Sequence, residues 1–166
     1  FQLCNLLQEN EKKVFLNTSD TKIQFKIGNS KIISKIIDGK FPDYHKVVPK
    51  NNNKTLLVNA KDFIHSIERV TTVSIDRKEG VKLTLGKDYI QLFVNSSSSG
   101  EGKEVLKANY NSEDLTISFN SRYLLDIASE IEDEKLVMNL NDSVSPVLIQ
   151  DKLDKQSYFV IMPMKI

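Results

Sequence analysis

The side chains best suited to catalysis gather at one place in the sequence. Four carboxylates lie within five residues, at Glu130, Glu132, Asp133 and Glu134. Carboxylates at close spacing can exchange protons with a substrate or bind a metal ion. Here they fall at the end of a predicted helix, with no histidine nearby and no metal-ligand spacing. We therefore interpret them as a solvated helix end, and keep a metal-dependent enzyme as an alternative hypothesis.

The other reactive side chains are few. One cysteine, Cys4, excludes an internal disulfide and fits a reducing compartment. Together with His45 and His65 it cannot form a zinc site of the usual Cys/His type. His65 alone could act as a base, but it lies on a basic polar stripe, which favours an exposed surface group. The sequence has no G-x-S-x-G, no glycine-rich phosphate loop and no H-E-x-x-H motif.

The composition is that of an ordinary globular domain. Of the 166 residues, 40% are apolar and 27% are charged, with a net charge of +1. No apolar run approaches the ~20 residues that a membrane-spanning helix needs. The net charge is +6 over residues 1–100 and −5 over residues 101–166. This layout suits a molecule whose faces meet different partners, although chance variation of solvated faces gives the same pattern.

Two segments have helical periodicity and matching start signals. Asn59 is a favourable N-cap with Asp62 three residues later, and Asn120 is a second N-cap. The predicted buried faces are Phe63, Ile64, Ile67 and Val70 in the first helix, and Leu124, Leu125, Ala128 and Ile131 in the second. Lys61, His65, Arg69 and Thr72 form a separate polar stripe on the first helix.

Alternating apolar residues predict strands around these helices. The predicted faces are Ile23, Phe25 and Ile27; Val81, Leu83 and Leu85; Ile90, Leu92 and Val94; Leu106 and Ala108; Leu115, Ile117 and Phe119; Leu136, Met138 and Leu140; Val147 and Ile149; and Tyr158, Val160 and Met162. Polar turns are expected at 86–88, 96–102 and 141–143.

The order of these elements repeats. Residues 55–110 and 114–163 each read as a strand, a helix and three strands, a repeat of about 60 residues. Residues 1–37 fit a truncated copy, with a helix remnant at Phe1, Cys4 and Leu7 and strands at 14–18, 22–27 and 31–37. Residues 38–54, rich in proline and asparagine, are the predicted linker. The fold class is therefore α+β, with one amphipathic helix over an antiparallel sheet in each repeat.

Four segments carry a family resemblance. They are ISKIIDGKFPDY at 33–44, FNSRYLLD at 119–126, SPVLI at 145–149 and VIMPMKI at 160–166. Together, and with their spacing, they resemble the bacterial replicative sliding clamp, the beta subunit of DNA polymerase III. The resemblance runs the length of the chain.

This resemblance implies an architecture and a function. The fold would be a DNA-clamp fold of repeated β-α-β-β-β units, with antiparallel sheets outside and helices on the inner face. Residues 1–44 would be the second half of the middle domain plus the linker, and residues 45–166 the complete third domain. The protein would be a non-enzymatic processivity factor of the bacterial cytoplasm, without cofactor or metal. Its partners would be duplex DNA, a second subunit in a head-to-tail ring, the polymerase III catalytic subunit, the clamp loader and repair proteins.

The resemblance also implies three sets of site residues. Those facing DNA would be Lys61, Arg69 and Arg122. Those at the subunit interface would be Thr72, Val73, Glu101, Glu104 and Leu106, with both glutamates facing basic groups. A groove for a short motif of glutamine, leucine and an aromatic or leucine pair would use Pro42, Lys46, Val47, Asn120, Tyr123, Val144, Val160, Met162, Pro163, Met164 and Lys165.

The peptide-binding set also suits its role chemically. Methionines are an adaptable apolar surface, prolines are rigid walls, and Asn120 can pair with a peptide amide. Lys46 and Lys165 stand where the family often has arginine, which removes a planar hydrogen-bonding fork. Part of the deep subpocket would come from residues that precede Phe1 in the family. The other alternative hypothesis is a peptide-binding adaptor without a nucleic-acid role. Two helices that lie side by side and share a basic face would disfavour this alternative.

Overall fold

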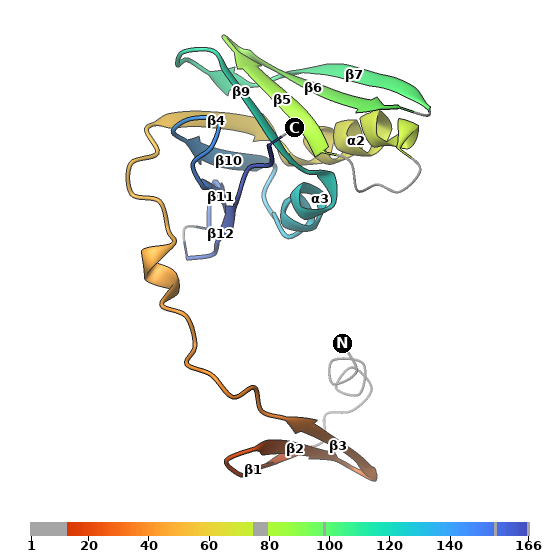
Figure 1. Cartoon of the computed structure of the whole chain (residues 1–166), viewed down its shortest axis with the longest axis vertical. Helices are drawn as coiled ribbons and strands as arrows, with labels where there is room; N and C mark the ends of the chain where they lie inside the picture. The colour runs from red at the N-terminus through yellow and green to blue at the C-terminus, as the bar shows by residue number, and fades with distance from the viewer. Residues whose placement is uncertain (1–12, 75–79, 98, 155, 166) are drawn as a thin grey trace. The chain divides into compact units, whose positions relative to one another are not determined.

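The computed structural model describes residues 13–74, 80–97, 99–154 and 156–165. The chain divides into two compact units, Phe1–Pro42 and Asp43–Ile166 (Figure 1). The predicted helix remnant at Phe1, Cys4 and Leu7 lies outside the described residues.

The first unit contains a three-stranded antiparallel sheet. Its strands are β1 (Val14–Thr18), β2 (Lys22–Ile27) and β3 (Ser30–Lys35), in the order β1-β2-β3. Gly28, with a φ of 57°, lies in the turn that brings Ile27 opposite Ser30. β3 ends at Lys35, two residues before the predicted end. In the described part of this unit Ile27 is the buried apolar residue, and Phe15, Leu16 and Ile33 are exposed.

The second unit contains the predicted repeat. After a short 3-10 turn, η1 (Tyr44–Lys46), the first copy comprises β4 (Lys54–Asn59), α2 (Ala60–Val70), η2 (Thr71–Val73), β5 (Gly80–Gly86), β6 (Tyr89–Ser96) and β7 (Gly100–Lys107). The short β8 (Asn109–Tyr110) follows. The second copy comprises β9 (Leu115–Asn120), α3 (Ser121–Ser129), β10 (Lys135–Leu140), β11 (Val147–Asp151) and β12 (Tyr158–Ile161).

Both helices begin as predicted. The side chain of Asn59 accepts a hydrogen bond from the amide of Asp62 at 3.0 Å. The side chain of Asn120 accepts from the amides of Arg122 and Tyr123 at 3.0 and 3.3 Å. Each helix therefore starts directly after a strand. The asparagine is the last residue of that strand, and its side chain accepts hydrogen bonds from free amides of the first helical turn.

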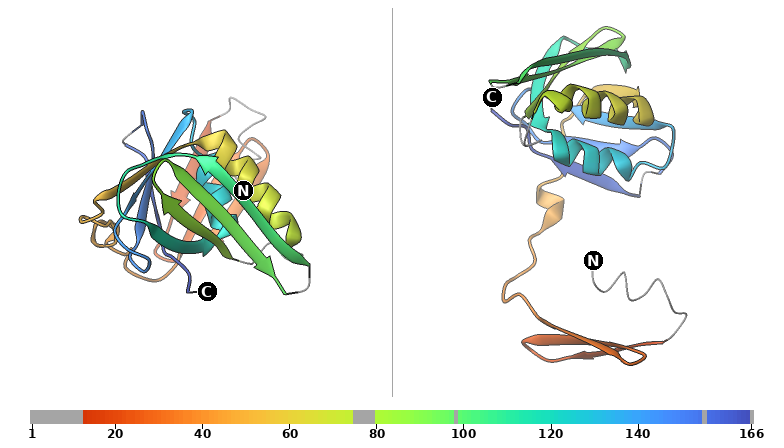
Figure 2. Two further views of the ribbon diagram at one scale, coloured as in Figure 1. Left: turned by 90° about the horizontal axis from the view of Figure 1, so that it is seen from above. Right: turned by 90° about the vertical axis from the view of Figure 1, so that its right-hand side faces the viewer.

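The two repeats exchange strands between their sheets. One sheet has the order β12-β11-β10-β4-β8 and the other β7-β6-β5-β9. Each sheet thus takes three strands from one repeat and the first strand of the other. α2 packs against β6 and β7 of one sheet, against β4 of the other, and against α3 (Figure 2). The predicted α+β class is confirmed, but this exchange of strands was not predicted.

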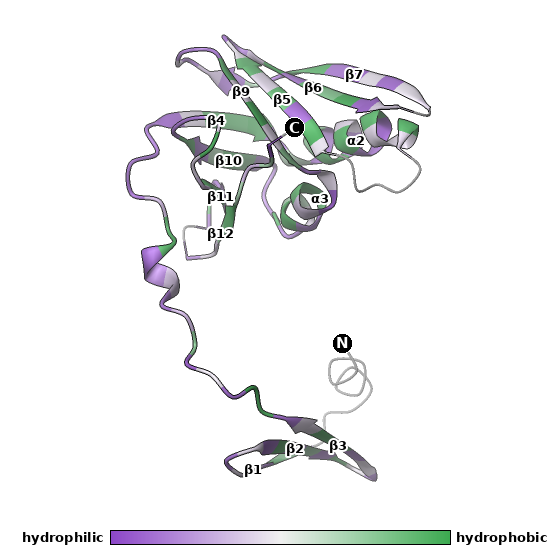
Figure 3. Ribbon diagram, in the orientation of Figure 1, coloured by the Kyte–Doolittle hydropathy of each residue, from purple (hydrophilic) through white to green (hydrophobic). Residues whose placement is uncertain are grey.

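One apolar core joins the two sheets and the helices. Its fully buried members include Phe63, Leu83, Leu92, Phe119 and Leu136, all on the predicted faces. Figure 3 shows hydrophobic residues in both sheets and in both helices. Two boundaries differ from the predictions: the loop after β6 is shorter, because Gly100 already begins β7, and Ala108 lies between β7 and β8.

The final strand presents a different face to the core from the one predicted. Phe159 and Ile161 pair with the buried Ile149 and Val147, and so lie on the core side of β12. Val160 and Met162 therefore lie on the opposite side. Because the side chains of Val160 and Met162 do not face the core, they are available for a contact with another molecule.

Candidate functional site

A groove of about 610 Å³ lies in the second unit. Its walls come from the segment before β4, the loop between β10 and β11, and the end of β12. Four predicted peptide-binding residues line it: Lys46, Val47, Val160 and Met162. The remaining lining residues, which were not predicted, are Val48, Pro49, Lys50, Asn51, Asn52, Asn141, Ser145 and Pro146.

The groove presents apolar side chains to solvent. Val47 is 59% exposed and Met162 is 61% exposed. Val144, in the loop between β10 and β11, is 61% exposed. Large apolar groups at such exposure, close to a concave surface, are typical of a binding site.

The loop that carries Val144 is ordered by one carboxylate. Asp142 accepts hydrogen bonds from the amides of Val144 and Ser145 at 2.9 and 2.7 Å. It also accepts from the Ser145 hydroxyl and from the Asn141 amide. The Val144 amide and these other donors hold the pKa of Asp142 below its ordinary value, because each stabilises the ionised form. The loop is thus held in one shape by local bonds.

The other wall is joined to this loop by Asn52. Its side-chain amide donates to the carbonyls of Asn139 and Pro146, at 2.8 and 2.9 Å. Sequence analysis missed Asn52, because it lies in a run of three asparagines that reads as linker. Nothing in the sequence distinguishes it from Asn51 and Asn53.

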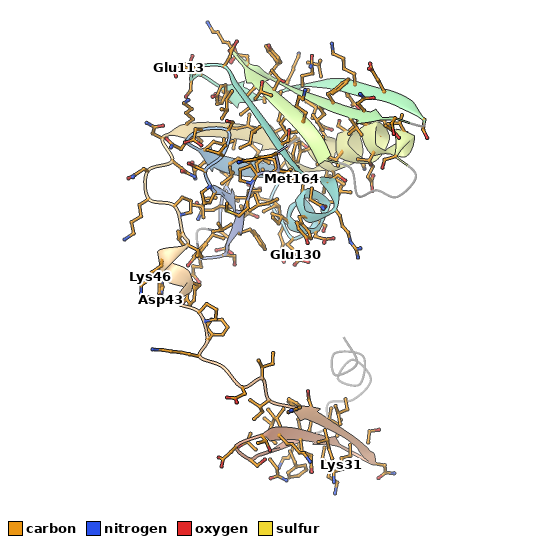
Figure 4. The ribbon with its side chains drawn as sticks, viewed as in Figure 1. Lys31, Asp43, Lys46, Glu113, Glu130 and Met164 are labelled. Carbon is orange, nitrogen blue, oxygen red and sulfur yellow. The ribbon has the colours of Figure 1, made fainter. Side chains whose placement is uncertain are left out.

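The other predicted peptide-binding residues lie around the C-terminal segment and the start of α3. The amide of Met164 donates to the carbonyl of Ser118 at 2.7 Å, which joins the C-terminal segment to β9 (Figure 4). Tyr123 is 59% exposed in the first turn of α3. Met164 and Lys165 are exposed and Pro163 is half-buried. Pro42 is exposed and ends the first unit.

Asn120 has less free hydrogen-bonding capacity than predicted. Its side-chain oxygen caps α3, so it is already occupied by two amides. Among the residues that the structure describes, its amide nitrogen has no partner. Asn120 therefore has a donor to offer a ligand rather than an acceptor.

The basic residues of the two helices differ in their surroundings. Lys61 and Arg122 are exposed, and no ion pair involves them within the described ranges. Arg69 instead pairs with Glu104 of β7: its Nε donates to Glu104 Oε2 at 3.0 Å, and its Nη2 also contacts Oε1. This pairing with Arg69 lowers the pKa of Glu104.

This ion pair changes the expectation for the predicted interface. Glu104 faces a basic group of its own chain, and the hydroxyl of the buried Ser66 also donates to it at 2.8 Å. Glu101 and Thr72 are exposed, whereas Val73 and Leu106 are half-buried against the core. β7 is an edge strand, so one side of its backbone is available for pairing.

Residues of the acidic cluster at 130–134 make hydrogen bonds with neighbouring segments. Glu134 accepts a hydrogen bond from the side chain of Asn59 at 3.3 Å, and the amide of Asp133 donates to Asp151 at 2.9 Å. Figure 4 shows Glu130 at the end of α3. Within the described residues no three His, Cys, Asp or Glu side chains are grouped for a metal ion.

Among the residues that the structure describes, no helix has the length and apolarity needed to cross a bilayer.

Comparison with known proteins gives the family. The family described as "DNA polymerase III beta subunit, C-terminal domain" matches residues 45–165. The one described as "DNA polymerase III beta subunit, central domain" matches residues 1–43. The beta sliding clamp of Caulobacter vibrioides is 34% identical over 161 residues, covering 97% of this chain and 43% of the relative. That of Escherichia coli K12 is 29% identical over 165 residues, covering 99% and 45%.

Solved structures agree with the sequence relatives. A sliding clamp from Bartonella birtlesii, bound to griselimycin, is 42% identical with a TM-score of 0.87, covering 98% of this chain and 44% of that one. The sliding clamp of Caulobacter crescentus is 33% identical with a TM-score of 0.89, covering 99% and 44%. The chain thus spans less than half the length of the relatives it matches. It belongs to the family of the DNA polymerase III beta subunit, the bacterial beta sliding clamps.

Proposed function

We propose that this chain is part of a DNA sliding clamp, a non-enzymatic protein that encircles duplex DNA and gives processivity to the replicative polymerase. Residues 1–44 would be the second half of the middle domain plus the linker, and residues 45–166 the complete third domain. The observation that carries the proposal is the match of residues 45–165 to the family's C-terminal domain. The protein would act in the bacterial cytoplasm.

The groove is the proposed attachment site for partner proteins. Val47, Val160 and Met162 would receive the apolar residues of a short peptide motif, with Val144, Tyr123, Pro163 and Met164 extending the apolar surface. The free amide of Asn120 would donate to a peptide carbonyl, and Lys46 and Lys165 would attract a carboxylate. The polymerase III catalytic subunit, the clamp loader and repair proteins would compete for this groove.

The helices are the proposed inner face of the ring. α2 and α3 pack against each other, and Lys61 and Arg122 are exposed on them. Such side chains would attract phosphates without reading bases, so the ring could slide. The packing of the two helices favours the clamp over a peptide-binding adaptor, because an adaptor needs a groove but no basic helix face.

Ring closure would use the end of α2 and the edge strand β7. Thr72, Val73 and Leu106 would supply the apolar contact with a second subunit, and Glu101 an exposed carboxylate. Glu104 would face Arg69 as well as any basic group of the partner. The open backbone edge of β7 could pair with a strand of that subunit.

A peptide titration tests the groove. A dye-labelled synthetic peptide containing Gln-Leu-Ala-Leu-Phe should bind the full-length clamp that contains this chain. The double variant Met162→Ala, Met164→Ala should lose about 1–3 kcal/mol of binding free energy, the usual effect of truncating anchor side chains. Fluorescence anisotropy would measure both affinities. Leu153→Ala is the matched control, because Leu153 is exposed and does not line the groove. Unchanged affinity in the double variant would move the partner site elsewhere.

A further inference from the structure

Asn52 makes the contacts that join the two walls of the groove. Its amide nitrogen donates one hydrogen bond to the Asn139 carbonyl and another to the Pro146 carbonyl, at 2.8 and 2.9 Å. An amide nitrogen has two hydrogens, so both are used and the side chain is fixed in orientation. The residue is half-buried, which protects these bonds from water.

The two acceptors lie at the base of one loop. Asn139 belongs to β10, and Pro146 directly precedes β11. Between them runs the loop that Asp142 holds together and that presents Val144 to solvent. One side chain therefore holds both ends of this loop.

The donor belongs to the opposite wall. Asn52 ends the segment 46–52, which contributes Lys46 and Val47 to the groove. In the part of the chain that the structure describes, no other hydrogen bond joins residues 46–52 to residues 139–146. Next to this contact, the Thr55 hydroxyl donates at 3.1 Å to the side-chain oxygen of Asn139, which is a different atom from the backbone carbonyl that Asn52 contacts.

We propose that Asn52 is a positioning residue that sets the spacing of the groove walls, and thereby the affinity for the peptide. The inference rests on the proposed peptide-binding function. A groove whose walls are already in place loses less conformational entropy when a peptide binds. Without the two donors, the Asn139 and Pro146 carbonyls lose their partners, and the wall that carries Val47 separates from the loop that carries Val144.

The test compares two substitutions of the same chemical kind. Asn52→Asp keeps the shape of the side chain but replaces the donor with a carboxylate facing two carbonyls. Asn53→Asp makes the same charge change one residue away, at an exposed position that does not line the groove. Asn52→Ala removes the donors without adding charge, and serves if Asn52→Asp does not fold. The labelled Gln-Leu-Ala-Leu-Phe peptide is titrated into each variant of the full-length clamp that contains this chain.

We expect Asn52→Asp to weaken peptide binding about tenfold, the ratio that corresponds to the loss of about one hydrogen bond. Asn53→Asp should bind like the wild type. Amide hydrogen exchange should accelerate at Val144 and Ser145 in the Asn52 variants but not at Leu83 in the core, which separates loss of the groove from general destabilisation.

The possible failures are distinguishable. Equal affinities for Asn52→Asp and Asn53→Asp, with a wild type that binds, would overturn the positioning role and leave the groove intact as a binding site. A full-length wild-type clamp that does not bind the peptide would contradict the proposed function instead. Hydrogen exchange would then still decide the role of Asn52, since unchanged exchange at Val144 and Ser145 in Asn52→Ala would refute it.

Discussion

The carboxylate of Asp151 accepts hydrogen bonds from the turn before β10 and from the turn after β11. Asp151 is 8% exposed at the end of β11. It accepts hydrogen bonds from the amides of Asp133 and Leu153 at 2.9 and 2.8 Å, and a longer one from Asp154. The Asp133 amide, followed by the Leu153 amide, lowers the pKa of Asp151 from its ordinary value of 3.8. The charged form is therefore part of the folded structure.

This pKa shift gives a pH dependence of defined sign. Because the pKa of Asp151 is lower in the folded state, its charge stabilises the fold fully above the unfolded-state pKa, and this stabilisation is lost as the pH falls through the folded-state pKa. Asp151→Asn should lower the free energy of unfolding at about pH 7. The difference in free energy of unfolding between this variant and the wild type should become smaller below about pH 4. Urea unfolding at both pH values measures this. The control is Asp126→Asn, on the exposed side of α3. If the free energies of unfolding of Asp151→Asn and the wild type differ by the same amount at both pH values, the prediction is wrong.

At the scale of elements, α2 and the edge strand β7 hold each other in place. Gly102, Glu104 and Leu106 lie on the side of β7 that faces the helix, as their partial burial shows. Glu104 is bound by Ser66 and Arg69 of α2. Gly102 lies against the last residue of the helix: a Cβ built there would be 2.4 Å from the Val70 carbonyl oxygen.

This close approach predicts a strong effect of one methyl group. Gly102→Ala must move β7 or the end of α2, because the atom in the way is backbone and cannot rotate aside. We expect a loss of about 1–3 kcal/mol in the free energy of unfolding, as for other overpacked sites. Chemical denaturation of the chain is the measurement. Gly39→Ala is the control, since nothing lies within 4 Å of a Cβ at that position. A Gly102→Ala protein as stable as the wild type would show that the contact is not tight.

At the scale of the whole molecule, the proposed ring should bind DNA through charge alone. Binding should be weak, independent of sequence and lost as salt rises, because it releases counterions from phosphates. Lys61→Glu and Arg122→Glu should each weaken binding and reduce the slope of log affinity against log salt by about one for each copy of the residue that contacts a phosphate. Arg69→Ala should have a smaller effect, because Glu104 already neutralises Arg69.

Anisotropy with two duplexes of unrelated sequence, in the assembled ring, measures this. Lys87→Glu is the control, because it makes the same charge change at the exposed turn between β5 and β6. A preference for one duplex, or an affinity insensitive to salt, would exclude the proposed mode of binding.

Much of this architecture was predictable because its signals are local. The N-caps at Asn59 and Asn120, the apolar faces of both helices and the alternation in β5 and β6 depend on residues a few positions apart. The repeat of strand, helix and three strands follows from the same local signals. Of the peptide-binding set, Lys46, Val47, Val160 and Met162 lie together at one groove, and the function of that groove stays a prediction.

The tertiary structure alone decided how distant segments meet. Three features each join residues that are thirty or more positions apart in the sequence. They are the exchange of β4 and β9 between sheets, the pairing of Arg69 with Glu104, and the two hydrogen bonds of Asn52. The outward face of β12 is a similar case, since both of its faces are apolar and only pairing with β11 selects one. Local periodicity determines which residues are buried within an element, but the partner of a backbone group or a charge depends on which elements pack together.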